Sequence, residues 1–286
     1  MRKPVSIGVR VGLLCAGVAL GATVASAQTI PTFAPDDSTS WFPDRAQGDD
    51  FLPPPGGGPG PVLSDPAHPY ITNDEGRNTG VQPTYRVADL SNPILTPWAI
   101  ALMKKANDEV LAGKVPYIAR ERCWPGGVPQ FDIFRRVAPV HIFQTPKEVI
   151  MVWPGDAQVR HVYLNVPHSA NVKPSWYGES VGHYEGDELV VDTIGQNNKT
   201  VIDNYRTPHT ELIHVVERFK LIENGNTLQV LIEVDDPGAF KMPWKAMQRF
   251  KRYHRGPMTE SACAENNTDF LGYSVIPIPL ADKPDF

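Results

Sequence analysis

The sequence predicts a mainly β fold, an antiparallel up-and-down barrel of about eight strands with one N-terminal helix and a long Pro/Gly-rich arm before it. Two observations predict this fold. Short segments that alternate apolar and polar residues recur between positions 140 and 253, and Gly-containing turns join several of them. No helical segments lie between these strands, which disfavours a parallel α/β sheet. Closure into a barrel would remove the unpaired edges of such a meander.

The first 27 residues have the composition of a cleavable secretory signal. Two basic residues at positions 2 and 3 precede an apolar run over 11–24, and the small residues at 25–27 (Ala-Ser-Ala) suit a signal peptidase. The run is shorter than the roughly 20 residues that span a bilayer. We therefore expect a mature chain that begins at Gln28, has no membrane span and is periplasmic or secreted.

The charge balance of the mature chain is acidic. The full sequence has 27 Lys and Arg against 32 Asp and Glu, and three of the basic residues belong to the signal. Because no Lys/Arg cluster remains after its removal, we expect no nucleic-acid partner.

Residues 28–97 form the predicted arm, since they lack periodicity and are rich in Pro and Gly. The run 51–61 (Phe-Leu-Pro-Pro-Pro-Gly-Gly-Gly-Pro-Gly-Pro) can join neither a helix nor a β ladder. Aromatic residues in the arm suggest that parts of it pack on the domain. A helix is predicted over 97–113, with Pro at its start, Gly at its end and an apolar stripe. The barrel domain with this leading helix covers 98–286.

The barrel strands are expected in hairpin-linked order, and the strongest turn signals are Glu-Gly-Asp at 185–187 and Asn-Gly-Asn at 224–226. A lipocalin-like barrel of about eight strands can hold one small ligand in its interior. The expected strands cover residues 140–145, 148–153, 158–165, 179–184, 188–194, 211–222, 227–235 and 245–253.

Strand alternation predicts that Glu217 faces inward, because it shares the more apolar face of the segment 211–222. Such a carboxylate has a raised pKa, which suits acid–base catalysis, unless a cation such as Arg160 pairs with it. Both roles remain open. In the strand of Arg160 either face places a donor inside, Arg160 itself on one and His161 with Tyr163 on the other.

Further polar residues are candidates for the same pocket. Asp192 is unusual inside a strand, and it faces either the interior or the next turn. We assign proton transfer to Glu217 and Asp192, with His209 or His168 as helpers. We expect an arginine to bind a ligand carboxylate, and aromatic and hydroxyl side chains to line the pocket. The predicted ligand-binding residues are Arg160, Tyr163, Trp176, Ser180 and Trp244.

Two cysteines remain after removal of the signal, and an even pair in an oxidising compartment predicts a disulfide. The histidines lack the spacing of metal ligands, so we expect no metal, and we expect no other cofactor. Cys123 and Cys263 would close a loop of roughly 140 residues in an oxidising compartment, which is worth about 4–5 kcal/mol in the chain-entropy model. Two separate buried thiols are the alternative. A metal site assembled from distant histidines is the alternative to metal-free chemistry.

The Gly-Glu-Ser-Val-Gly run at 178–182 matches the G-x-S-x-G pattern of serine hydrolases. Ser180, Asp192 and His209 also follow the chain order of a hydrolase triad. The α/β units that carry such a serine are missing from the pattern, so close glycine packing in a strand is the other interpretation.

Several segments resemble a family of exported bacterial proteins of uncharacterised function, and the similarity covers roughly residues 120 to 266. The segments are Pro-Ser-Trp-Tyr-Gly-Glu-Ser-Val-Gly at 174–182, Glu-Gly-Asp-Glu-Leu-Val-Val-Asp-Thr at 185–193, Val-Glu-Arg-Phe at 216–219, Asp-Pro at 236–237 and Cys-Ala-Glu-Asn at 263–266. This chain departs from the family at 165–168 and at His183 and Tyr184, where members often carry Arg and Trp. Some similar proteins act as lyases or decarboxylases on aromatic acids.

We therefore expect a periplasmic barrel that acts on or binds a small, partly apolar ligand such as an aromatic carboxylate. The leading hypothesis is metal-free acid–base chemistry of the lyase, decarboxylase or isomerase type. The alternatives are a non-catalytic ligand-binding or envelope protein and a serine hydrolase that uses Ser180. The oligomeric state is left open.

Overall fold

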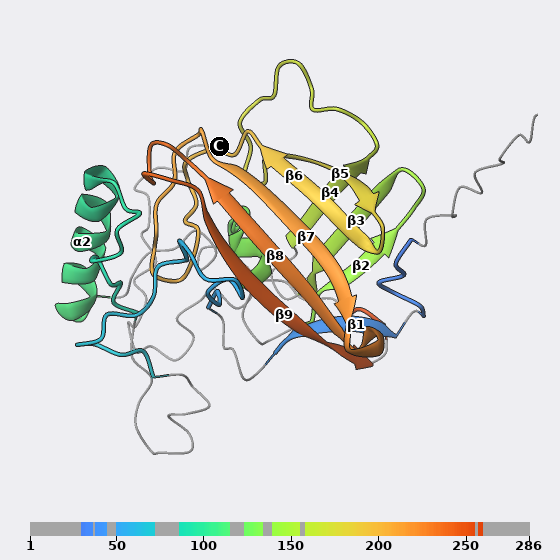
Figure 1. Cartoon of the computed structure of the whole chain (residues 1–286), viewed down its shortest axis with the longest axis horizontal. Coiled ribbons are helices and arrows are strands. Elements are labelled where there is room, and N and C mark those ends of the chain that lie inside the picture. The colour runs from blue at the N-terminus through green and yellow to red at the C-terminus, as the bar shows by residue number, and fades with distance from the viewer. Residues whose placement is uncertain are drawn as a thin grey trace, which may run out of the picture.

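The computed structural model shows a strongly curved β-sheet with one long helix beside it (Figure 1). The predicted signal over 1–27 and Cys263 lie outside the described residues, so the cleavage site and the Cys123–Cys263 disulfide stay predictions. Within the described part of the chain, no helix is long and apolar enough to cross a membrane. The structure describes residues 30–36, 38–44, 50–71, 86–114, 123–133, 139–154, 158–254 and 257–259.

Nine strands form one mixed sheet in the order β1-β9-β8-β7-β6-β5-β4-β3-β2. The sheet curls into a nearly closed barrel, so the predicted mainly β barrel is confirmed, with nine described strands in place of about eight. The strands are β1 (Thr39–Pro43), β2 (His141–Gln144), β3 (Glu148–Trp153), β4 (Gln158–Leu164), β5 (Glu179–Glu185), β6 (Glu188–Ile194), β7 (His214–Ile222), β8 (Thr227–Asp235) and β9 (Trp244–His254).

The strand that brings the sheet towards closure comes from the segment expected as an extended arm. β1 pairs antiparallel with β9, and Trp41 exchanges two main-chain hydrogen bonds of 2.8 Å with Val140 next to β2. Trp41 is fully buried, and its indole N–H donates to the carbonyl of Phe33 at 2.9 Å. Burial of these aromatic side chains holds an otherwise irregular segment against the barrel.

One strand pair departs from the expected antiparallel order. β4 and β5 are parallel, and their register joins Val162, Tyr163 and Leu164 to Ser180, Val181 and Gly182. Two-residue hairpins permit only antiparallel neighbours, whereas the long connection over 165–178 lets the chain return to the same end before it pairs. The first half of β4, from Gln158 to His161, consequently has no partner in β5.

Helix α2 (Pro97–Leu111) agrees with the predicted helix and lies outside the barrel in Figure 1. The Thr96 hydroxyl caps it by accepting from the amide of Ala99 at 3.3 Å, and Pro97 occupies the first turn. The side-chain amide of Asn107 both accepts from and donates to the main chain of Ala88 at 2.9 Å. This pair attaches the helix to the segment that precedes it.

Alternation along the strands decides which side chains enter the barrel. In β4 every second residue from Gln158 onward is buried, which places Arg160 inside and leaves His161 and Tyr163 outside. In β7 the inward residues include Glu217 and Phe219, so the prediction for Glu217 is confirmed. The aromatic rings of Trp153, Phe219 and Phe131 of the short 3₁₀ helix η2 (Gln130–Ile133) are buried among them.

Candidate functional site

The interior polar group is built around an ion pair between Arg160 of β4 and Glu217 of β7. The Nη1 atom of Arg160 donates to Oε1 of Glu217 at 2.8 Å, and Nη2 contacts Oε2 in a second, shorter contact. Both side chains are 0% exposed. This bidentate geometry pairs both buried charges. Of the two roles that the sequence left open for Glu217, the geometry therefore favours the structural ion pair.

Two hydroxyl groups complete the coordination of Arg160. Its Nη2 atom donates to Oγ1 of Thr193 at 3.0 Å and to Oγ of Ser180 at 3.3 Å. The two hydroxyl oxygens lie 2.8 Å from each other. Ser180 is 3% exposed, so its hydroxyl belongs to this buried network.

Asp132 on η2 adds a second acid to the interior, and the sequence did not point to it. The residue is 2% exposed. Burial, followed by the negative charge of Glu217, raises the pKa of Asp132 well above its ordinary value. A protonated Asp132 hydrogen-bonded to an ionised Glu217 leaves Arg160 with one neutralising partner, which balances the buried charges.

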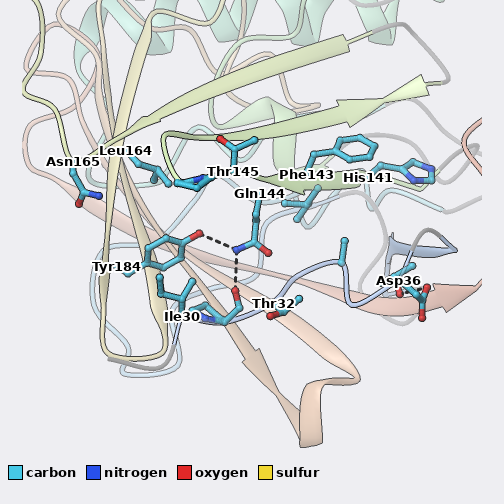
Figure 2. A pocket seen from close by; sticks show the side chains of 15 residues that line it. Ile30, Thr32, Asp36, His141, Phe143, Gln144, Thr145, Leu164, Asn165 and Tyr184 are labelled. Carbon is cyan, nitrogen blue, oxygen red and sulfur yellow. Dashed lines mark hydrogen bonds between the residues drawn. The ribbon is translucent and has the colours of Figure 1, made fainter. Parts of the chain in front are cut away.

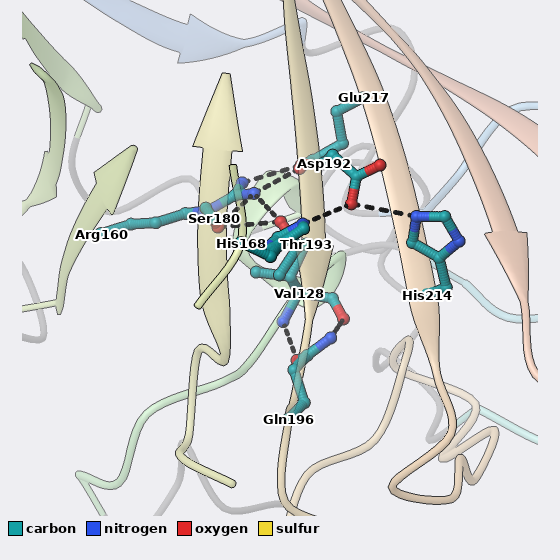
Figure 3. A network of polar contacts seen from close by, with 9 residues as sticks. All are labelled: Val128, Arg160, His168, Ser180, Asp192, Thr193, Gln196, His214 and Glu217. Carbon is teal, nitrogen blue, oxygen red and sulfur yellow. Dashed lines mark hydrogen bonds and ion pairs between the residues drawn. The ribbon is translucent and has the colours of Figure 1, made fainter. Parts of the chain in front are cut away.

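A second polar network includes outward-facing residues of β5, β6 and β7, and Figure 3 shows three of its members, His168, Asp192 and His214. The Nε2 atom of His168 is 2.8 Å from Oδ1 of Asp192, and its Nδ1 atom is 3.1 Å from Oε1 of Glu179. The Nε2 atom of His214 is 3.0 Å from the same Oδ1 of Asp192. We call these four residues, His168, Glu179, Asp192 and His214, the outer relay.

The outer relay is accessible to solvent, in contrast to the interior group. The side chains of His168 and Glu179 are 22% exposed, and those of Asp192 and His214 are 40% and 43% exposed. The hydroxyl of Ser169, its amide N–H and His168 hold the pKa of Glu179 below its usual value. Glu179 is therefore ionised at neutral pH.

A pocket of about 400 Å³ lies between the two networks. It opens where the first half of β4 has no partner in β5. Ser180 and Tyr177 form its boundary towards the interior group, because Ser180 contacts Arg160 and Tyr177 packs against Phe131 with 5.9 Å between ring centroids. Glu179 and Ser169 form its boundary towards the outer relay, and the remaining lining includes Val159, His161, Tyr163, Asn171, Val172, Lys173 and Gly178.

The structure does not bring the predicted catalytic residues into one place. Glu217 lies in the interior group, whereas Asp192 and His168 belong to the outer relay. His209 lies in neither, because its Nε2 atom is 2.8 Å from Oγ1 of Thr200 and its Nδ1 atom is 2.9 Å from the carbonyl of Thr210. Burial lowers the pKa of His209.

The predicted aromatic wall also separates. Tyr163 is 48% exposed and lines the pocket from outside the barrel. The ring of Trp176 lies 5.3 Å from that of Trp124, and Trp244 is buried against Phe240 with ring centroids 5.6 Å apart. The expectation of one pocket walled by all three is corrected, because strand alternation directs Tyr163 and Trp244 to opposite faces of the sheet.

The hydrolase geometry is likewise not assembled. Ser180 Oγ contacts Arg160 and Thr193, and His209 contacts Thr200 and Thr210. The glycines of the motif fit the packing interpretation. A side chain at Gly182 would meet Val162 at 2.9 Å and Val190 at 3.0 Å.

The fold and these networks define a nearly closed β-barrel with an interior ion-pair group and an accessible pocket beside an outer relay. No group of His, Cys, Asp and Glu side chains suited to a metal ion occurs in the described ranges. Comparison with protein-family models, curated proteins and solved structures finds no match for this chain. The resemblance to a family of exported bacterial proteins of uncharacterised function stays a prediction.

Proposed function

We propose that this protein, in the periplasm, binds a small aromatic carboxylate in the pocket at the β4–β5 junction and converts it by metal-free acid–base chemistry of the lyase or isomerase type. The observation that carries this proposal is the position of the pocket, which borders the outer relay through Glu179 and Ser169. A volume of about 400 Å³ suits a small ligand.

The lining supplies the groups that an aromatic acid requires. Tyr163 and Tyr177 offer ring surface, and Ser169 contributes a hydroxyl group. Lys173 places a cation in the wall. This lysine replaces Arg160 as the proposed partner of the ligand carboxylate, because the guanidinium of Arg160 is already bound by Glu217.

The outer relay gives a proton route from solvent to the pocket wall. His214 is the most exposed member and contacts Asp192, which contacts His168, which contacts Glu179 in the wall. We assign proton storage to His168 and transfer at the wall to Glu179. In a decarboxylation, cleavage of the C–C bond would release CO2 and leave an electron pair on carbon, which would take the proton from His168 through Glu179.

The binding part of the proposal is tested by calorimetric titration with 4-hydroxycinnamate and with the neutral 4-hydroxycinnamyl alcohol. Lys173→Met is expected to weaken binding of the acid about tenfold and to leave binding of the alcohol unchanged. Lys147→Met, in the β2–β3 turn, is the matched control and should bind both as the wild type does. Equal binding of acid by Lys173→Met and wild type contradicts the assigned carboxylate position.

The catalytic part is tested by following loss of 4-hydroxycinnamate and formation of CO2 in the same samples. His168→Asn should abolish turnover while binding changes less than about threefold, because the asparagine keeps a polar contact but cannot store a proton. His183→Asn, which removes a histidine paired with Glu185 at 2.9 Å on the outer surface of β5, is the control.

A non-catalytic binding protein is the second candidate. The observation that favours it is the pairing of Glu217 with Arg160, which engages both carboxylate oxygens of the acid to which the sequence assigned proton transfer. Binding of 4-hydroxycinnamate by the wild type with no loss of the compound supports this candidate over the lyase.

A further inference from the structure

A second and larger pocket lies at the seam of the barrel, where β1 and β2 approach each other (Figure 2). Its volume is about 830 Å³. The seam is joined by the main-chain bridge between Trp41 and Val140. Beyond that bridge, the segment 30–36 crosses β2 and is attached through a side chain, that of Gln144.

Gln144 fixes the shape of this seam pocket. Its Oε1 atom accepts from the amide of Phe33 at 2.7 Å, and its Nε2 atom donates to the carbonyl of Pro31 at 2.9 Å. The same Nε2 atom donates to the hydroxyl of Tyr184 at 2.8 Å. Phe33 is fully buried, and its carbonyl also accepts from the indole N–H of Trp41. These contacts hold the middle of the crossing segment in place, so the pocket is preformed.

The walls of the seam pocket are mostly apolar and carry little charge. Ile30, Ile142, Phe143 and Leu164 supply the apolar surface. Burial lowers the pKa of His141, so its ring is neutral at pH 7. The charged group in the lining is Asp36 at one end, whose pKa is lowered by hydrogen bonds from Ser38 and Thr39.

We propose that the seam pocket is a binding site for a neutral, largely apolar small molecule that reaches the polar groups of Gln144 and Tyr184 at one point. An anion is disfavoured because the ionised Asp36 repels it and because none of the described residues that line the pocket is a lysine or an arginine. This ligand class differs from the aromatic carboxylate assigned to the β4–β5 pocket, which contains Lys173. The two sites flank the parallel β4–β5 ladder, one beside Tyr163 and the other beside Leu164.

The test uses the fluorescent neutral amine N-phenyl-1-naphthylamine with the full mature chain. Ala34→Trp is expected to fill the pocket and raise the dissociation constant of the probe about tenfold or more, whereas Ala34→Ser keeps wild-type binding. Thr32→Asp adds a charge to an exposed lining position without filling the volume, and it should weaken the probe about threefold to tenfold, with Thr32→Ser as its control.

Circular dichroism melting identifies any variant that fails to fold, and Thr32→Asp then stands in for Ala34→Trp. Binding of 4-hydroxycinnamate should be the same in all four variants, which separates this site from the proposed function. Absence of probe binding to the wild type, or equal binding by wild type, Ala34→Trp and Thr32→Asp, overturns the proposal.

Discussion

The interior group and the outer relay each take residues from β5, β6 and β7, on opposite faces of these three strands. Glu179 is followed by Ser180 in β5, and Asp192 by Thr193 in β6, and in each pair one side chain faces outward and the other inward. In β7, His214 is partly exposed and Glu217 is fully buried. Polar residues that are close in sequence therefore enter environments that differ in dielectric and in access to solvent.

This difference separates stability from chemistry. In the interior, the Arg160–Glu217 pair is removed from water, so loss of one partner leaves an uncompensated charge. On the outer surface, the contacts of Asp192 compete with water and contribute little to stability. Their accessibility, however, is what the proposed proton exchange with solvent and with a ligand in the adjoining pocket requires.

The largest expected effect is that of Glu217→Gln on stability. The change leaves the buried Arg160 without a charged partner and should lower the free energy of unfolding by about 3–5 kcal/mol, measured by urea denaturation. Glu233→Gln is the control, because Glu233 pairs with Lys245 on the surface at 3.1 Å and its removal should cost less than about 1 kcal/mol.

The double variant Arg160→Met with Glu217→Leu should recover most of the lost stability, since it removes both buried charges together. A stable Glu217→Gln protein that has lost turnover would instead place the reaction inside the barrel.

The next effect is the pH dependence that Asp132 imposes. Its raised pKa means that the folded protein keeps a proton that the unfolded chain releases above its ordinary pKa of 3.8. This contribution to stability is present below pH 3.8 and is lost as the pH rises towards the folded pKa. Asp132→Asn, which mimics the protonated acid, should therefore show a smaller decline in unfolding free energy between about pH 4 and 8.

Burial also raises the pKa of Asp203, to about 6, so Asp203 lowers the unfolding free energy with rising pH in the same way. This contribution is the same in the wild type and in Asp132→Asn, and it cancels when their curves are subtracted. Asp108→Asn on the exposed surface of α2 is the control and should follow the wild-type curve. Parallel curves for Asp132→Asn and wild type would show that Asp132 is ionised in the folded protein.

Local patterns in the sequence predict much of the fold. The Glu-Gly-Asp and Asn-Gly-Asn turns lie between the paired strands β5–β6 and β7–β8, and the apolar alternation around Glu217 identifies the buried face of β7. The parallel pairing of β4 with β5 could not be predicted, because the connection over 165–178 does not encode the direction in which the chain returns.

The candidate site was predictable only in part. Arg160, Ser180 and Glu217 were assigned to one pocket and do meet. Strand alternation is a local signal that predicted the inward face for Glu217, whereas it left the inward face of the strand of Arg160 open. Asp132 lies in a single 3₁₀ turn without periodicity, so its burial depends on contacts distant in sequence. Glu179 and His214 resemble ordinary solvated positions of a strand, and only the fold places His168 of the connecting loop between Glu179 and Asp192.

The smallest stability effect is expected at Asp192, and its neighbour provides the matched comparison. Asp192→Asn should change the unfolding free energy by less than about 1 kcal/mol, because the contacts to His168 and His214 are partly solvated. Thr193→Val should cost about 1–3 kcal/mol, because the buried Arg160 and Ser180 lose a hydrogen-bonding partner. Unfolding free energy from urea denaturation should fall more in Thr193→Val, whereas turnover of 4-hydroxycinnamate should fall more in Asp192→Asn. These opposite orders would separate the inward face of β6, which stabilises the barrel, from the outward face, to which we assign proton transfer. A larger stability loss for Asp192→Asn than for Thr193→Val would show instead that the outer relay holds the barrel together.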